Sequence, residues 1–171
     1  RLAVAFLLAA LIGLERQRQQ RPAGLRTHIL VCMASALFTM CSLLVAGSSN
    51  DPGRIAAQIV TGIGFLGAGT IMRHGSIVTG LTTAASLWMA AAIGLAAGLG
   101  WYTGATLTAV AAFLVLTVVK LLEDRLPLAE HTVRFIITAR PGANPLPGVL
   151  ETVNSLGGQL EEITFGEGTV A

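Results

Sequence analysis

The stretch GSIVTGLTTAASLWMAAAIGLAAGLGWYTGATLTAVAAFLVLTVV, residues 75–119, contains no charged side chain. It is too long for a single membrane span, because a bilayer core about 30 Å thick needs about 20 apolar residues of helix. Its middle carries the turn signal Gly98-Leu99-Gly100-Trp101-Tyr102, and Trp and Tyr are enriched at membrane interfaces. The stretch therefore predicts two spans joined by a turn at the membrane surface.

Further apolar segments lie upstream of this pair. The chain is 53% hydrophobic and only 12% charged, with a mean hydropathy of +0.72, whereas about a quarter of the residues of a soluble domain are charged. We predict an all-α polytopic membrane bundle of five transmembrane helices in a domain of residues 1–126. The expected spans lie at about 1–15, 28–47, 55–73, 77–98 and 101–122.

The first apolar segment, Leu2 to Leu14, is short. A helix of this length covers only about 20 Å. Polar residues from Glu15 to Arg21 follow it, where a signal peptide would have small residues at a cleavage site. We expect part of a longer span rather than a signal peptide.

Basic residues in the short loops predict the orientation, because Lys and Arg are retained on the cytoplasmic side. The first and third connections and the segment after the last span carry most of them, which places the N-terminus outside and the C-terminus in the cytoplasm. The net charge of +2 reflects this topology. No basic patch with interleaved aromatic residues accompanies it, so we expect a lipid bilayer and no nucleic acid as partner.

The composition changes after Pro127. Residues 131–140 alternate as a half-buried strand does, Leu146 to Leu156 has helical spacing, and residues 159–165 suggest a second strand. We predict a partial α+β domain over residues 131–171. Two strands and one helix bury too little apolar surface to be stable alone, so further strands are expected beyond Ala171.

The segment Gly62-Ile63-Gly64-Phe65-Leu66-Gly67-Ala68-Gly69 matches the GxGxxG dinucleotide pattern. Nothing predicts a strand before it or a ribose-binding acid about 20 residues after it, so we expect no nucleotide. Glycines let membrane helices approach closely. The favoured interpretation is that Gly62, Gly64, Gly67 and Gly69 pack the third span against Ala90, Gly94 and Gly98 of the fourth. The alternative is an unwound helix that lines a cavity.

Few polar residues lie near the bilayer. Glu15 is expected to form an ion pair that fixes the first loop, with Arg16 and Arg26 in reach, or else to serve as a cation or proton site. Gln58 is expected to bond to a neighbouring helix. Glu15 and Asp51 fall on opposite sides, the histidines lack metal-ligand spacing, and no nucleophile has an adjacent base. We therefore predict no metal, no cofactor, no catalytic residue and no enzymatic activity.

Five ordered motifs, taken together, point to a family. They are Gly13-Leu14-Glu15-Arg16, Pro22-Ala23-Gly24-Leu25-Arg26-Thr27-His28, Asp51-Pro52-Gly53-Arg54-Ile55-Ala56-Ala57-Gln58, Gly62 to Ile71, and Gly80-Leu81-Thr82-Thr83-Ala84-Ala85. In these motifs the chain resembles the MgtC/SapB family of bacterial inner-membrane proteins. The resemblance implies five spans and a cytoplasmic ACT-like domain, to which the C-terminal fragment is similar.

The resemblance also implies a role in adaptation to magnesium limitation and in the virulence of pathogens that grow inside macrophages. It suggests a regulator that acts through protein contacts, with the F-type ATP synthase as a candidate membrane partner and a second copy of the chain as another. The positions that match the family motifs and are expected to carry function are Glu15, Arg16, Arg26, Thr27, His28, Asp51, Arg54, Gln58, Thr82 and Thr83.

We therefore expect a non-enzymatic inner-membrane regulator, and the alternative is a cation transporter or channel component for Mg²⁺ or coupled to protons. Continuous helix from Gly62 to Gly69, buried against the fourth span, favours the regulator. A broken helix there, with carbonyl groups facing a cavity, favours transport.

Overall fold

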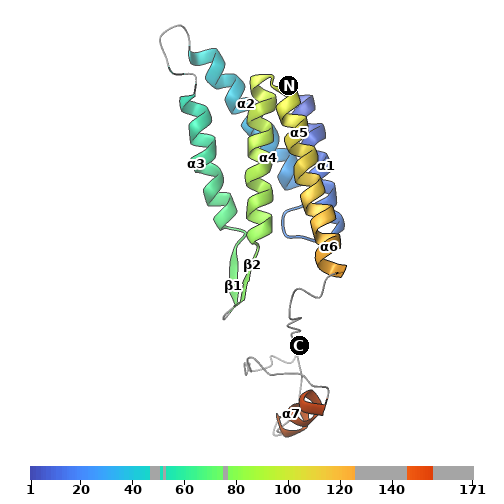
Figure 1. Ribbon diagram of the computed structural model, residues 1–171. Coiled ribbons are helices and arrows are strands. Elements are labelled where there is room, and N and C mark those ends of the chain that lie inside the picture. The colour runs from blue at the N-terminus through green and yellow to red at the C-terminus, as the bar shows by residue number, and fades with distance from the viewer. Residues whose placement is uncertain (47–50, 52, 75–76, 126–145, 156–171) are drawn as a thin grey trace. The chain divides into compact units, whose positions relative to one another are not determined.

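The computed structural model describes residues 1–46, 51, 53–74, 77–125 and 146–155. The chain divides into two compact units, Arg1–Leu128 and Ala129–Ala171. The first unit is a bundle of helices with one small β-hairpin (Figure 1). Its helices are α1 (Leu2–Arg18), α2 (Leu25–Ala46), α3 (Arg54–Ala68), α4 (Leu81–Leu99) and α5 (Tyr102–Leu114), and α5 continues through the π-helix η1 (Val115–Val119) into α6 (Lys120–Arg125).

Three helical stretches of the described chain are long and apolar enough to cross a membrane: Leu25–Val45, Leu81–Leu99 and Tyr102–Leu122. The predicted helical membrane bundle is thus confirmed, but five full-length spans are not. With 17 and 15 residues, α1 and α3 are shorter than the others. At 1.5 Å per residue, α3 covers only about 22 Å.

Small side chains form the core of the bundle. The helix α4 lies between α3 and α5 in Figure 1, and it contacts all of α1, α2, α3 and α5. Small residues allow membrane helices to approach to backbone contact, where dispersion and weak hydrogen bonds act. The core residues that are fully buried are Ala5, Ala9, Ile12, Cys32, Ala36, Ala90, Ile93, Ala97, Ala105 and Ala109.

Two glycines of α4, Gly94 and Gly98, pack against α2, not α3. A Cβ added at Gly98 would lie 2.6 Å from the carbonyl oxygen of Ala36 and 2.8 Å from Cβ of Thr39. Gly94 likewise faces the backbone of α2 at Cys32. The predicted pairing of these glycines with the glycine-rich third span is therefore wrong, because the close approach that they permit is already used by α2.

The glycines of α3 are mostly open. No atom lies within 4 Å of a Cβ added at Gly62 or Gly64. Of the glycines within α3, Gly67 is the one that faces α4, where an added Cβ would lie 3.6 Å from Cβ of Ala84. The helix is nevertheless continuous from Arg54 to Ala68, with Gly69 as its C-cap. The alternative interpretation, an unwound helix that lines a cavity, is therefore not found here.

A hairpin of β1 (Met72–His74) and β2 (Ile77–Thr79) occupies positions that were predicted to extend the third and fourth spans. The strands pair antiparallel, with Met72 opposite Thr79. The β-branched run Ile77-Val78-Thr79 favours strand over helix. Gly80 then turns the chain into α4 at φ 90°, a conformation that glycine adopts without strain.

In the second unit, the described element is α7 (Leu146–Ser155). It coincides with the helix that the spacing of its apolar residues predicts. The predicted strands at 131–140 and 159–165 lie outside the described residues.

Candidate functional site

The last turn of α1 places a buried arginine between three helices. Arg16 is only 3% exposed, and its Nη2 donates a hydrogen bond to Oγ1 of Thr83, at 2.6 Å, in the first turn of α4. The Nε atom is buried and has no hydrogen-bond partner among the described residues. Arg16 is therefore held by one neutral hydroxyl group rather than by a carboxylate.

A second polar link joins α2 to α4 beside it. His28 is fully buried; its Nδ1 lies 2.9 Å from the carbonyl oxygen of Gly24, and its Nε2 lies 3.1 Å from Oγ of Ser86. Since a carbonyl oxygen only accepts, Nδ1 carries the proton that bonds to Gly24. The hydroxyl of Ser86 lies 2.8 Å from the carbonyl oxygen of Thr83 as well. Its single hydrogen serves either that oxygen or Nε2 of neutral His28.

A glycine allows α1 and α2 to come this close. A Cβ added at Gly13, one turn before Arg16, would lie 2.8 Å from Cα of Leu25 and 3.1 Å from Cβ of His28. The end of α1 therefore touches the backbone at the start of α2. This contact brings Arg16 and His28 to the same end of α4. We call Arg16, His28, Thr83 and Ser86 the polar cluster.

Glutamines, not an ion pair, fix the loop between α1 and α2. The Oε1 atom of Gln17 accepts a hydrogen bond from the backbone N–H of Leu25, at 3.3 Å. The side-chain amide of Gln19 donates to the carboxylate of Glu15. Arg26 is exposed, and no ion pair joins it to Glu15 in the part of the chain that the structure describes. The ion pair expected between Glu15 and Arg26 is thus not found among the described residues, and Glu15 is bonded to Gln19 instead.

Several positive groups lie at the end of the bundle that holds the polar cluster. The helices α2 and α4 both begin there, and a helix N-terminus carries about half a positive charge. Arg18, Arg21 and Arg26 are exposed on the last turn of α1, the loop and the first turn of α2. Within the described ranges no carboxylate makes an ion pair with Arg16.

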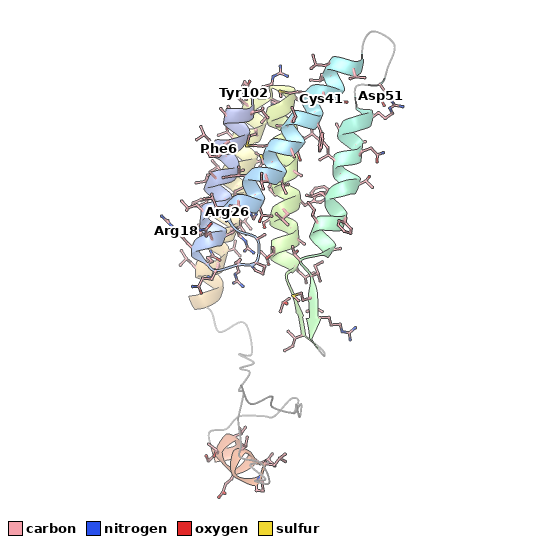
Figure 2. The ribbon with its side chains drawn as sticks, turned by 180° about the vertical axis from the view of Figure 1, so that it is seen from behind. Phe6, Arg18, Arg26, Cys41, Asp51 and Tyr102 are labelled. Carbon is pink, nitrogen blue, oxygen red and sulfur yellow. The ribbon has the colours of Figure 1, made fainter. Side chains whose placement is uncertain are left out.

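The other predicted site residues do not join the cluster. Figure 2 shows Asp51 at the opposite end of the bundle from Arg18, where its carboxylate accepts the backbone N–H of Gly53 at 2.8 Å. Arg54 and Gln58 are exposed on α3, and Gln58 makes no hydrogen bond to another described helix, contrary to expectation. The remaining two, Thr27 and Thr82, are exposed beside the cluster.

Sequence reasoning missed Ser86 and Gln19. Ser86 follows Thr83 by three residues, the spacing that puts two side chains on one helix face, and this was the available signal. Gln19 follows Glu15 by four residues, a spacing that also puts two side chains on one helix face. In the described part of the chain, no three His, Cys, Asp or Glu residues gather as a metal site would require.

Comparison with known proteins identifies the relatives of this chain. The profile of the MgtC family matches residues 2–125. "Protein MgtC" of Salmonella typhimurium (strain 14028s) is 58% identical over 104 residues, which are 61% of this chain and 44% of that protein. "Protein MgtC" of Brucella abortus (strain 2308) is 50% identical over 129 residues, 75% of this chain and 52% of that protein. The match thus spans about half the length of these relatives. No solved structure matches the chain significantly.

Proposed function

Since the chain belongs to the MgtC family, we propose that it is a non-enzymatic inner-membrane protein that regulates a membrane partner during adaptation to low magnesium and virulence-type stress. The family resemblance suggests the F-type ATP synthase as that partner. In the proposed topology the N-terminus is outside and the C-terminus is cytoplasmic. The polar cluster then lies at the cytoplasmic end of the bundle.

The observation that carries a partner-binding role is the outward face of α3. Gly62 and Gly64 have open space beside them and, being two residues apart, lie on opposite flanks of the outward side of α3, with Phe65, 83% exposed, between these flanks. In a membrane, either flank allows another helix to approach the backbone of α3 closely, with the aromatic side chain of Phe65 beside the contact. The same face would otherwise be covered by lipid alone.

Two features favour this role over cation transport. The backbone of α3 is helical through Gly62 and Gly64, so its carbonyl groups are engaged within the helix rather than presented to an ion. Of the two acids proposed for a pathway, Glu15 lies in the last turn of α1, which ends at Arg18, and is bonded to Gln19. Asp51 lies at the other end of the bundle from Arg18 (Figure 2). Neither feature suits a continuous cation pathway through one protomer.

The test is a bulky substitution on the α3 face. Gly64→Leu adds a side chain where no atom lies within 4 Å, so insertion and abundance should be unchanged. Ala111→Leu is the matched control, because Ala111 is also a small exposed residue, on α5. We expect Gly64→Leu, and not Ala111→Leu, to reduce both growth at low magnesium and recovery of the F-type ATP synthase with the tagged full-length protein after crosslinking.

A measurement of cation flux tests the proposal against the transporter alternative. The full-length protein, reconstituted in liposomes across a magnesium gradient, should give no flux above empty liposomes. Flux that Glu15→Gln or Asp51→Asn abolishes would place these acids in a pathway and replace the regulator with a transporter. Equal growth and equal recovery for Gly64→Leu and Ala111→Leu would remove the α3 face from the proposal.

A further inference from the structure

Arg16 is a buried cation that makes no ion pair with a described side chain, although the charge of its sequence neighbour Glu15 attracts it. Burying a guanidinium group costs several kcal/mol unless it is paired and hydrogen-bonded. Among the described residues, the guanidinium group has one hydrogen-bond partner, the hydroxyl of Thr83, and its buried Nε has none. The nearest acid in sequence, Glu15, accepts the side-chain amide of Gln19.

Two helix N-termini near Arg16, together with Arg21, add positive potential to that of its own charge. Thr83 lies in the first turn of α4, whose N-cap Gly80 provides no side-chain hydrogen bond, and the first intrahelical bond of α4 is donated by Ala84. The backbone N–H groups of residues 81–83 therefore have no acceptor within the helix. The first turn of α2 also lies beside the start of α4, because His28 of α2 is hydrogen-bonded to Ser86 of α4. Two helix N-termini and a buried cation thus converge.

We propose that the polar cluster is a binding site for the phosphate group of an anionic phospholipid headgroup. A phosphate oxygen supplies the acceptor that Nε of Arg16 lacks, and its charge is stabilised by the guanidinium group and by both helix N-termini. This inference goes beyond the proposed regulatory role, because it concerns a ligand and is measured without a growth phenotype or a protein partner.

The location favours a headgroup as the source of the phosphate. Arg16 lies in the last turn of α1, near the level at which the bundle ends and headgroups begin. Exposed Arg18, Arg21 and Arg26 lie around it, and basic groups at the end of a span attract anionic lipid. The exposed arginines bring the lipid to the surface, and buried Arg16 provides the specific contact.

The test uses the full-length protein in dodecyl maltoside, titrated at constant ionic strength with dioctanoylphosphatidylglycerol, dioctanoylphosphatidylcholine or inorganic phosphate. Thermal unfolding is followed by the fluorescence of Trp88 and Trp101. We expect a saturable rise in Tm with the anionic lipid and a much smaller one with the other two. Arg16→Met should weaken that binding about tenfold or more, the scale of one charge-assisted hydrogen bond. Arg18→Met, the matched control that removes an exposed charge from the same helix, should change it less than about twofold.

Each other outcome overturns the inference. Equal weakening by Arg16→Met and Arg18→Met would mean a general basic surface. Binding of inorganic phosphate that matches the lipid and depends on Arg16 would assign the site to a free anion. If Arg16→Met does not fold, the wild-type protein labelled with ¹⁵N-arginine gives the answer, because binding at Arg16 must shift a protected Nε–H resonance. No such shift at saturating lipid would refute the site.

Discussion

Gly94→Ala should destabilise the bundle, because this residue of α4 lies against the backbone of α2. An added Cβ would overlap the carbonyl oxygen of Cys32 and would lie 2.9 Å from both the carbonyl carbon of Cys32 and Cβ of Ser35. Overpacking costs about 1–3 kcal/mol, and backbone obstruction puts this site near the upper figure. Replacing glycine by alanine within a helix stabilises the helix by about 1 kcal/mol. The expected net loss is therefore about 2 kcal/mol.

Gly62→Ala is the matched control, since a Cβ there meets no atom within 4 Å. It should leave stability unchanged or raise it by up to about 1 kcal/mol. The assay is reversible unfolding of the full-length protein by sodium dodecyl sulfate in mixed micelles, followed by tryptophan fluorescence. A Gly94→Ala protein as stable as wild type, together with a less stable Gly62→Ala protein, would refute the assignment of the close helix contact to α2 and α4.

Two further substitutions probe the polar cluster and the turn beside it. Thr83→Val keeps the side-chain shape but removes the hydroxyl group that accepts the hydrogen bond of Arg16, so the free energy of unfolding in the same assay should fall by about 1.5–3 kcal/mol. Thr82→Val, at an exposed neighbouring position, should cost less than about 0.5 kcal/mol, and equal effects would show that the bond to Arg16 contributes nothing. Gly80→Ala should lower the free energy of unfolding by more than about 1 kcal/mol, because Gly80 has φ 90° and a Cβ there overlaps the carbonyl of Thr70. The control Gly69→Ala, at φ −62°, should leave stability unchanged or raise it. A larger loss of stability from Gly69→Ala than from Gly80→Ala would contradict the turn geometry.

Local signals in the sequence were sufficient to locate the helices of the charge-free stretch. The turn predicted at Gly98 to Tyr102 is present, and Gly100 ends α4 in the left-handed conformation, at φ 89°. Glycine at this position and the apolar length on both sides are properties of a short segment. They do not depend on what the segment packs against, which is why they could be predicted.

The partner of each helix face could not be predicted in this way. Small residues at four-residue spacing show that a helix can be approached closely, but they do not say by which neighbour. Gly94 and Gly98 suit α2 as well as α3, and the shape of the whole bundle decides between them. The hairpin was missed for a related reason, since Ile77-Val78-Thr79 is as apolar as a span and differs from one only in its β-branched side chains.

The polar cluster was predicted in its residues but not in its contacts. Arg16, His28 and Thr83 all lie in recognisable motifs. The rule that basic residues are retained in cytoplasmic loops would, however, place Arg16 at the membrane surface with its guanidinium group in water. Its burial follows from Gly13, which lets α2 close over the end of α1. The bond between His28 and Ser86 joins residues 58 apart in the chain, and spacing within one helix carries no information on such a pair.

The shortness of α3 bears on where a partner would bind. Its 15 residues cover about 22 Å, so a hydrocarbon core of about 30 Å exceeds it by about 8 Å. The hairpin that follows has exposed Met72 and Val78, but its open strand edges cannot lie in hydrocarbon, so it extends α3 only into the interface. Thinning of the bilayer around a short span costs a fraction of a kcal/mol per Å, and association with another protein relieves that cost. Because the exposed positions Gly62 and Gly64 are on this same helix, mismatch and close packing both favour α3 as the surface for a membrane partner.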